Sequence, residues 1–229
     1  MTSDPGREDG NSYVFGSNGP LRALWYSLTY RLNRVLKTGN RRAEFEHKYR
    51  KHGDYFSYRS KPYERTKYEH TLAAVMRARR GKASVLETGC SVGVFTRMLA
   101  ETFDEVVASD ISSEALRIAT KTVGSVGNVS YLRSAVEAID VGRKFDVILL
   151  AEILLFVREC DSERLLSMLD RHIKDDGIII EVANADRPPS KKFFFAWDRH
   201  ISERFPIVSL ERHEDPSWPY EIVVYARPP

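Results

Sequence analysis

The sequence predicts an α/β fold, in which helices cover both faces of a mostly parallel seven-stranded sheet that ends in an antiparallel hairpin. From residue 83 onward, short runs rich in Val, Ile and Leu alternate with stretches of helical length, as in βαβ units. The chain has 229 residues and is 42% hydrophobic, which suits one domain with a buried core. The last two β runs flank a turn that contains proline, which is typical of a hairpin.

Each element is expected from its own segment of sequence. Strands are predicted at ASVLET (83–88), EVVASDI (105–111), VSYLRS (129–134), FDVILLAE (145–152), GIIIEVAN (177–184), PIVSLERHED (206–215) and YEIVVYARPP (220–229). Helices are predicted over 94–103, 113–123 and 163–173. A turn at Asp175–Gly177 is expected to separate the last of these helices from the strand that follows it.

Before residue 83 the chain is expected to form an appendage, with the body of the protein spanning 83–229. Residues 1–20 are rich in Gly, Ser, Asn and Asp, which predicts a disordered tail. Residues 21–82 are interpreted as a basic helical arm and lid. A second helix of this arm is expected over 62–80, where one face carries Tyr68, Leu72, Val75 and Met76 and Gly81 ends the helix.

The first helix of the arm is predicted over 20–38. Apolar residues recur there at spacings of three and four, at Leu21, Leu24, Trp25, Leu28, Leu32, Val35 and Leu36. Basic residues occupy the rest of that surface, at Arg22, Arg31, Arg34 and Lys37. Such a helix either docks on its own domain, which is the commoner case, or contacts a membrane surface or a partner.

Composition and charge exclude several classes of protein. Residues 1–82 carry 18 Lys and Arg against 8 Asp and Glu, and residues 83–229 carry 17 against 24. A basic arm on an acidic body indicates an anionic partner or closure over its own domain. No apolar run approaches the roughly 20 residues of a membrane span, and the polar start predicts no secretory signal. Cys90 and Cys160 match no disulfide or metal framework, so a cytoplasmic protein is expected, membrane-peripheral if the arm binds lipid.

The most informative segment is VLETGCSVGVFT, residues 85–96. A strand ends at Glu87, a loop carries Gly89 and Gly93, and a helix follows at once. A dinucleotide fingerprint would need a third glycine where Thr96 stands. Asp110 ends the next strand, 21 residues after Gly89, where a carboxylate hydrogen-bonds ribose hydroxyls. Taken alone, Asp110 could equally be a helix cap.

The pattern E-x-G-x-x-x-G resembles the first motif of class I S-adenosylmethionine-dependent methyltransferases, which have a Rossmann-like fold. The resemblance implies S-adenosylmethionine as cofactor, with S-adenosylhomocysteine as product. It also implies that Glu87 lies near the methionine portion and that the loop Gly89, Cys90, Ser91 and Gly93 shapes the pocket. Ser91 stands where many members have a glycine.

The resemblance further places the ribose on Asp110, with Ile111 beside it. Many members carry an Asp that meets the adenine amino group, but Ala135 occupies that position here, so adenine would rely on the backbone of Ala135 and Val136 or on Glu137. Glu152 follows the fourth strand and is the candidate catalytic residue. It is a general base, a binder of an acceptor ammonium or hydroxyl, or a helix cap, and the sequence does not separate these roles.

Residues 45–226 also resemble the nodulation N-methyltransferase family, through HGDYFSYRSKPYERTKYEHTLAAV, the E-x-G-C-S loop, DIS and LLAEILLF. This resemblance adds Tyr63 and Arg65 to the expected cofactor site. It implies methyl transfer to nitrogen or oxygen of a small-molecule acceptor, with an amino sugar or another saccharide as one candidate. For a hydroxyl acceptor, His47, His52 and His70 are further candidate bases by type.

Three other functions compete with methyl transfer as interpretations of the sequence. A dehydrogenase would show a cleaner glycine triplet and a fully parallel sheet. A non-catalytic methyltransferase-like module, docked to a membrane or partner by its basic helix, remains the alternative. Nucleic-acid binding is disfavoured because the body is acidic and no base-methylation motif of the Asn-Pro-Pro-Tyr type follows the fourth strand.

Overall fold

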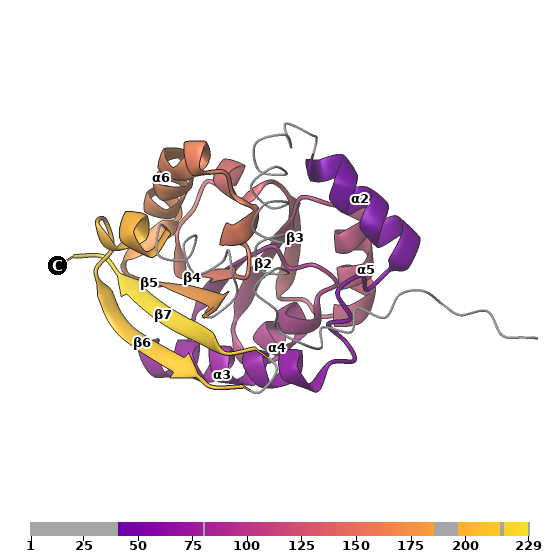
Figure 1. The fold of residues 1–229 in the computed structure, drawn as a ribbon, viewed down its shortest axis with the longest axis horizontal. Coiled ribbons are helices and arrows are strands. Elements are labelled where there is room, and N and C mark those ends of the chain that lie inside the picture. The colour runs from indigo at the N-terminus through magenta and orange to yellow at the C-terminus, as the bar shows by residue number, and fades with distance from the viewer. Residues whose placement is uncertain (1–40, 80, 186–196, 216–217, 229) are drawn as a thin grey trace, which may run out of the picture. The chain divides into compact units, whose positions relative to one another are not determined.

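The computed structural model describes residues 41–79, 81–185, 197–215 and 218–228 (Figure 1). The tail and first helix predicted before residue 39 lie outside these residues. In chain order the elements are α2 (Arg41–His52), α3 (Pro62–Ala78), β1 (Ser84–Thr88), α4 (Val94–Thr102), β2 (Glu105–Asp110), α5 (Ser113–Val123), β3 (Val129–Arg133), β4 (Phe145–Ala151), α6 (Ser162–His172), β5 (Ile173–Asn184), β6 (Ile207–His213) and β7 (Tyr220–Ala226). Short 3₁₀ helices are η1 (Val136–Ala138), η2 (Leu154–Phe156) and η3 (Glu159–Asp161).

The described strands form a seven-stranded sheet in the order β3-β2-β1-β4-β5-β7-β6. The pairs from β3 to β5 are parallel, and β7 runs antiparallel to both β5 and β6. The predicted fold class is therefore confirmed, including the C-terminal hairpin. Because the order reverses between β1 and β4, the carboxyl ends of these two strands border the crevice where ligands of such sheets bind.

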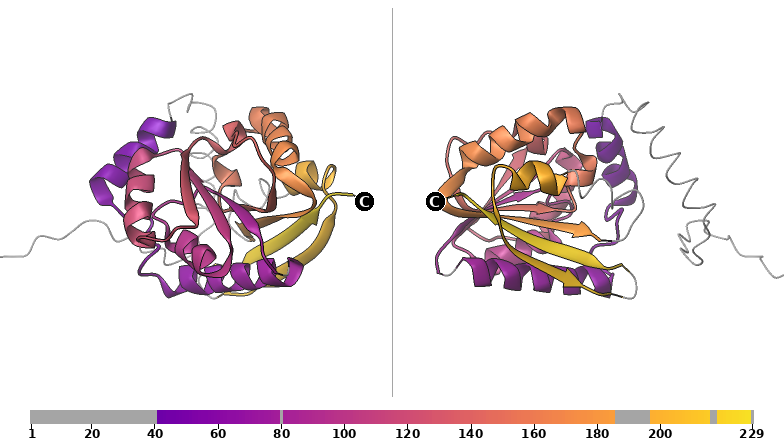
Figure 2. Two further views of the ribbon diagram at one scale, coloured as in Figure 1. Left: turned by 180° about the vertical axis from the view of Figure 1, so that it is seen from behind. Right: turned by 60° about the vertical axis from the view of Figure 1, so that its left-hand side comes forward.

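Helices cover both faces of the sheet, with α3 on one side and α6 on the other (Figure 2). Alternate strand residues supply the two cores. Leu86 and Ile148 pack on the side of α6, whereas Val85 and Val147 pack on the side of α3 and α4. All four of these side chains are fully buried, as expected for central parallel strands covered on both faces. Among the described residues, no helix is long and apolar enough to cross a membrane.

Two local predictions were wrong. The turn expected at Asp175–Gly177 lies within β5, at an irregularity in the pairing with β4, where Phe145 pairs with Ile173 but Val147 pairs with Ile178. The face predicted for the second helix was also wrong at Met76, which is 51% exposed.

The buried face of α3 is instead largely polar. Its buried residues are Glu64, Lys67, Thr71, Ala74 and Val75. A search for apolar residues at helical spacing does not detect this face, because two of its buried residues, Glu64 and Lys67, are charged.

Candidate active site

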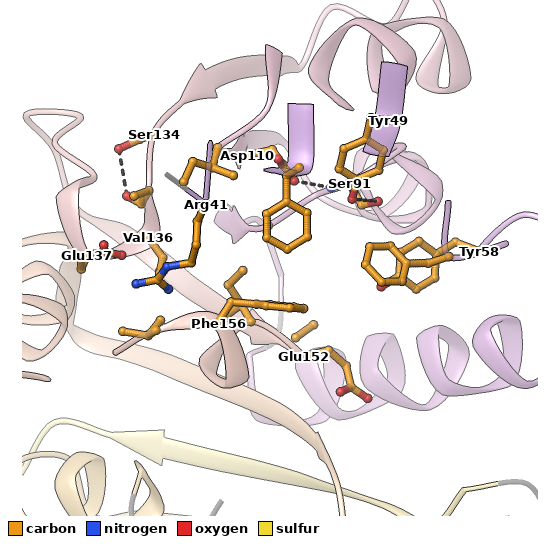
Figure 3. A pocket seen from close by; sticks show the side chains of 18 residues that line it. Arg41, Tyr49, Tyr58, Ser91, Asp110, Ser134, Val136, Glu137, Glu152 and Phe156 are labelled. Carbon is orange, nitrogen blue, oxygen red and sulfur yellow. Dashed lines mark hydrogen bonds between the residues drawn. The ribbon is translucent and has the colours of Figure 1, made fainter. Parts of the chain in front are cut away.

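A pocket opens at the carboxyl edge of the sheet, beyond the ends of β1 to β4 (Figure 3). Its lining residues are Arg41, Phe45, Tyr49, Phe56, Tyr58, Gly89, Ser91, Asp110, Ile111, Ser134, Ala135, Val136, Glu137, Ala151, Glu152, Ile153, Phe156 and Val157. Eight of the residues predicted from sequence therefore meet in one cavity: Gly89, Ser91, Asp110, Ile111, Ala135, Val136, Glu137 and Glu152. This edge is where open α/β sheets bind their ligands.

Asp110 ends β2 with its carboxylate facing the pocket, and only 7% of the residue is exposed. Its Oδ2 accepts the backbone N–H of Ser91 at 3.0 Å, and its Oδ1 accepts that of Ser112 at 2.9 Å. The cap of α5 is Ser112, whose hydroxyl accepts from Ala115 N, so Asp110 is not needed for that role. Burial raises the pKa of Asp110 to about 6, although these hydrogen bonds oppose the rise.

The loop after β1 brings backbone close to the cavity. Gly89 has φ +71°, and a Cβ there would lie 2.7 Å from Ile153 Cδ1. Ser91 has φ +52°, a conformation that glycine adopts more readily, which explains why many relatives of this motif have glycine there. The serine hydroxyl instead makes a 2.7 Å hydrogen bond with Tyr49 Oη. This contact ties the loop to α2.

Glu87, Cys90 and Gly93 lie behind the loop and do not line the pocket. Thr96 donates a hydrogen bond to Glu87 Oε2 at 2.6 Å. The threonine that occupies the third glycine position of a dinucleotide motif therefore fixes the buried Glu87 carboxyl group. Burial raises the pKa of Glu87 to about 7. A Cβ on Gly93 would lie 2.8 Å from Ala119 Cα, so that glycine allows α4 and α5 to approach. These residues support the loop from behind rather than facing the cavity.

The far end of the pocket lies beyond β3. Ser134 N donates to Asp110 O at 3.0 Å and fixes the chain there. Ala135, Val136 and Glu137 follow and line the cavity, and Arg41 reaches it from α2 (Figure 3). From sequence we expect no cofactor contact before Phe45, so the position of Arg41 in the pocket lining corrects that expectation.

Segments before β1 form the other wall. Phe45 of α2 meets the Phe156 ring edge-on at a centroid distance of 5.1 Å. Glu46 holds α2 onto the start of α5, because its Oε2 accepts the Ser112 hydroxyl at 2.8 Å and the Glu114 N–H at 3.3 Å. A carboxylate at a helix N-terminus is favoured by the unpaired N–H groups there. The pKa of Glu46 is lowered, because these hydrogen bonds outweigh the desolvation of the carboxyl.

Glu152 follows β4 and adopts φ +54°, which is strained for a residue other than glycine. Its backbone N–H donates to Val182 O at 2.8 Å. Lys67 Nζ lies 3.0 Å from Glu152 Oε1, and Asn184 Nδ2 lies 3.5 Å from Oε2. The N-cap residue of the 3₁₀ helix η2 is Ile153, and no side chain makes a capping hydrogen bond there. Glu152 therefore does not act as a helix cap.

The remaining predicted residues lie away from the pocket. Tyr63 donates to Asn184 Oδ1 at 3.2 Å. Arg65 projects into solvent, with 81% of its side chain exposed, and pairs with Glu69, because Glu64 and Lys67 are the residues that α3 turns inward. The candidate bases His47, His52 and His70 do not line the cavity either. Among the described residues, no group of His, Cys, Asp and Glu side chains could hold a metal ion.

Sequence reasoning missed much of the wall that faces the sheet edge. Arg41, Phe45, Tyr49 and Phe156 carry no motif, and they reach the pocket only through tertiary packing. The sequence carries no local signal for them. The polar stripe of Glu64, Lys67 and Thr71 on α3, at spacings of three and four, indicates instead the buried charged group behind Glu152.

Comparisons with known proteins identify the family and the fold. Residues 43–184 match the model of the family described as Nodulation protein S (NodS). Nodulation protein S of Bradyrhizobium diazoefficiens is 30% identical over 77 residues, which are 34% of this chain and 37% of that protein. Ubiquinone biosynthesis O-methyltransferase of Rickettsia conorii is 28% identical over 100 residues, which are 43% of this chain and 34% of that protein. The chain thus matches well under two thirds of the length of these curated relatives.

Among solved structures, the fold is similar to N-methyltransferase NodS from Bradyrhizobium japonicum WM9 in complex with S-adenosyl-L-homocysteine. The TM-score is 0.68 at 14% identity, over 89% of this chain and 98% of that one. At such identity the likeness establishes the fold, which is Rossmann-like as in class I methyltransferases. Since the family match covers more than half of the sequence, the chain belongs to the Nodulation protein S (NodS) family.

Proposed function

We propose that the protein is an S-adenosylmethionine-dependent methyltransferase that transfers a methyl group to nitrogen or oxygen of a small-molecule acceptor. The observation that carries the proposal is the Asp110 carboxylate, buried at the tip of β2 beside the glycine loop and facing a cavity. Membership of the NodS family and the adenosyl ligand of the NodS crystal structure support it. The same observations favour an enzyme over a non-catalytic binding module.

The residues present fit the cofactor. The two hydrogen bonds that Asp110 accepts leave lone pairs on both oxygens for ribose hydroxyls. A Cβ at Gly89 would fill the space between the loop and Ile153. The backbone of Ala135 and Val136 lines the opposite end, where adenine would lie.

When bound, S-adenosylmethionine supplies a methyl group on positively charged sulfur. The protein then has to hold the acceptor in line with that methyl group and exclude water. Glu152 is suited to hold the acceptor or take its proton, because it lines the cavity between Ala151 and Ile153, although its carboxylate is turned toward Lys67 on α3 (Figure 3). A neutral amine attacks directly, whereas a hydroxyl requires a base.

The acceptor is tested by product formation with methyl-labelled S-adenosylmethionine. Glucosamine and short amino-sugar oligomers come first, because the family resemblance implies them, and simple phenols and alcohols form the second group. Label in an amine or hydroxyl product, lost in Glu152→Gln but kept in the exposed control Glu69→Gln, supports the proposal. Absence of label in every acceptor class, despite cofactor binding, would contradict the small-molecule assignment.

We also propose that residues 45–70 act as a lid over the cofactor and acceptor. Tyr49, Phe56 and Tyr58 line the pocket from this segment, and Tyr49 is joined to Ser91 by its hydroxyl. S-adenosylhomocysteine is therefore expected to slow amide hydrogen exchange across residues 55–67. If the loop at Gly89 becomes protected on ligand binding but hydrogen exchange across residues 55–67 does not change, the lid proposal is wrong.

A further inference from the structure

Three charged side chains meet behind the pocket, where α3 faces the ends of β4 and β5. Lys67 Nζ lies 3.0 Å from Glu152 Oε1 and 3.0 Å from Glu64 Oε2. The same ammonium lies 4.9 Å from the centroid of the Tyr63 ring. Lys67 is 4% exposed and Glu64 8%. One lysine is thus shared between two carboxylates in a site that largely excludes water.

Such a group is expensive to bury, because each charge loses hydration that its partners must replace. Burial lowers the pKa of Lys67, but the carboxylates of Glu152 and Glu64 outweigh burial and shift it upward. Lys67 is therefore charged at every physiological pH. The backbone of Glu152 is strained as well. A fold that needed only a packed helix would use apolar residues at these positions, so the arrangement points to function.

The three members do not reach the pocket equally. Glu152 lines it, whereas Glu64 and Lys67 do not. Glu152 also lies at a defined end of the cavity, because its neighbour Ile153 packs against the Gly89 loop. The Ser134–Glu137 segment lies toward the opposite end (Figure 3). The net charge of Glu64, Lys67 and Glu152 therefore acts on the part of a ligand that lies near Gly89.

The net charge follows from the groups that face Glu152. Tyr58, Tyr63 and Tyr68 also interact with its carboxylate, and burial raises the pKa of each of these phenols above its usual value. They are neutral at pH 7, and Asn184 carries no charge. Two carboxylates and one ammonium remain, with a sum of minus one.

We propose that Glu64 shares the charge of Lys67 and thereby leaves Glu152 with net negative charge, which favours a cation at the Gly89 end of the pocket. The inference rests on the proposed function, in which that cation is the positively charged sulfur of S-adenosylmethionine. S-adenosylhomocysteine is neutral at the same atom. Glu64 and Lys67 are thus positioning residues that act through Glu152, and their effect is selection of the methyl donor over the product.

Calorimetric affinities for the two ligands test this charge selection without any acceptor. Glu64→Gln keeps the shape of the side chain and removes its charge, so Lys67 then neutralises Glu152 fully. The preference for S-adenosylmethionine over S-adenosylhomocysteine is expected to fall about 3- to 10-fold, as for one charge acting across a partly screened site. Affinity for the neutral product is expected to stay near its original value.

Two further variants separate charge from structure. Glu64→Asp retains the charge and is expected to retain the preference. Glu69→Gln removes an exposed carboxylate from the same helix, where its partner is Arg65, and is expected to change nothing. Glu152→Gln is expected to lower the preference as Glu64→Gln does, and it serves as a second test of charge if Glu64→Gln fails to fold.

The outcomes are distinguishable from a failure of the proposed function. Equal losses for both ligands in Glu64→Gln would mean a purely structural role and would overturn the inference alone. An unchanged preference in both glutamine variants would overturn it too. If the unaltered protein binds neither adenosyl ligand, the proposed function fails, and the inference fails with it.

Discussion

Protonation of Asp110 is expected to weaken cofactor binding as the pH falls below neutrality. Burial raises the pKa of Asp110 to about 6. Ribose hydroxyls donate hydrogen bonds to the ionised carboxylate, so a bound ligand favours the form that has lost its proton. Affinity is therefore complete well above about pH 6 and declines as the pH drops through that value. At about pH 5, roughly a tenth of Asp110 is ionised, which lowers affinity about 10-fold, or ~1.4 kcal/mol.

Calorimetry with S-adenosylhomocysteine between about pH 5 and pH 8 measures this decline, because the sulfur of that ligand carries no charge. Asp110→Asn is the matched variant, since it keeps the side-chain shape without a group that ionises. It is expected to bind more weakly at neutral pH and to lose most of the pH dependence. Glu87, whose pKa burial raises to about 7, does not line the pocket, so it is expected to contribute little to the decline. Constant affinity in the unaltered protein would refute the reasoning.

Four other predictions concern stability, the glycine loop and the arm. Burial raises the pKa of Glu181 from 4.5 to about 8, so the folded chain retains a proton that the unfolded chain releases, and stability falls as the pH rises between these values. Glu181→Gln should reduce this decrease in the free energy of unfolding with pH, as measured by urea unfolding at several pH values. The same dependence on pH in the variant and the unaltered protein would count against this. Gly93→Ala should destabilise the fold by about 1–3 kcal/mol, because its Cβ meets backbone of Ala119. Gly89→Ala should lower the melting temperature less than Gly93→Ala does but weaken ligand binding more, because its Cβ meets only the side chain of Ile153. Equal decreases in melting temperature for the two variants would contradict this. Removal of residues 1–37 should lower the melting temperature while the full chain ignores anionic vesicles, as for a helix docked on its own domain. Full stability with loss of vesicle binding would instead support a membrane helix.

The architecture could be predicted from sequence because local patterns encode it. Buried parallel strands are continuous apolar runs, and the strand, glycine loop and acidic residue 110 occur in the order that the fold requires. Asp110 and Gly89 were found for this reason. A turn was expected at Asp175–Gly177 because an irregularity inside a long strand uses the same residue types as a turn.

The walls of the pocket could not be predicted in the same way. Tyr49 and Ser91 are 42 positions apart, and nothing local links them. Arg65 was selected by resemblance, but the direction of a side chain on a helix depends on which face docks. On α3 that face carries Glu64 and Lys67, which a search for apolar periodicity passes over.

The central claim, that this chain binds the methyl donor, is tested most directly by calorimetric titration with S-adenosylmethionine, S-adenosylhomocysteine and NAD. The account predicts that each adenosyl ligand binds once per chain and that NAD gives no heat. Asp110→Ala should weaken both adenosyl ligands by about 1–3 kcal/mol, because ribose hydroxyls are left buried without an acceptor. Binding of NAD, or no heat from either adenosyl ligand, would contradict the account.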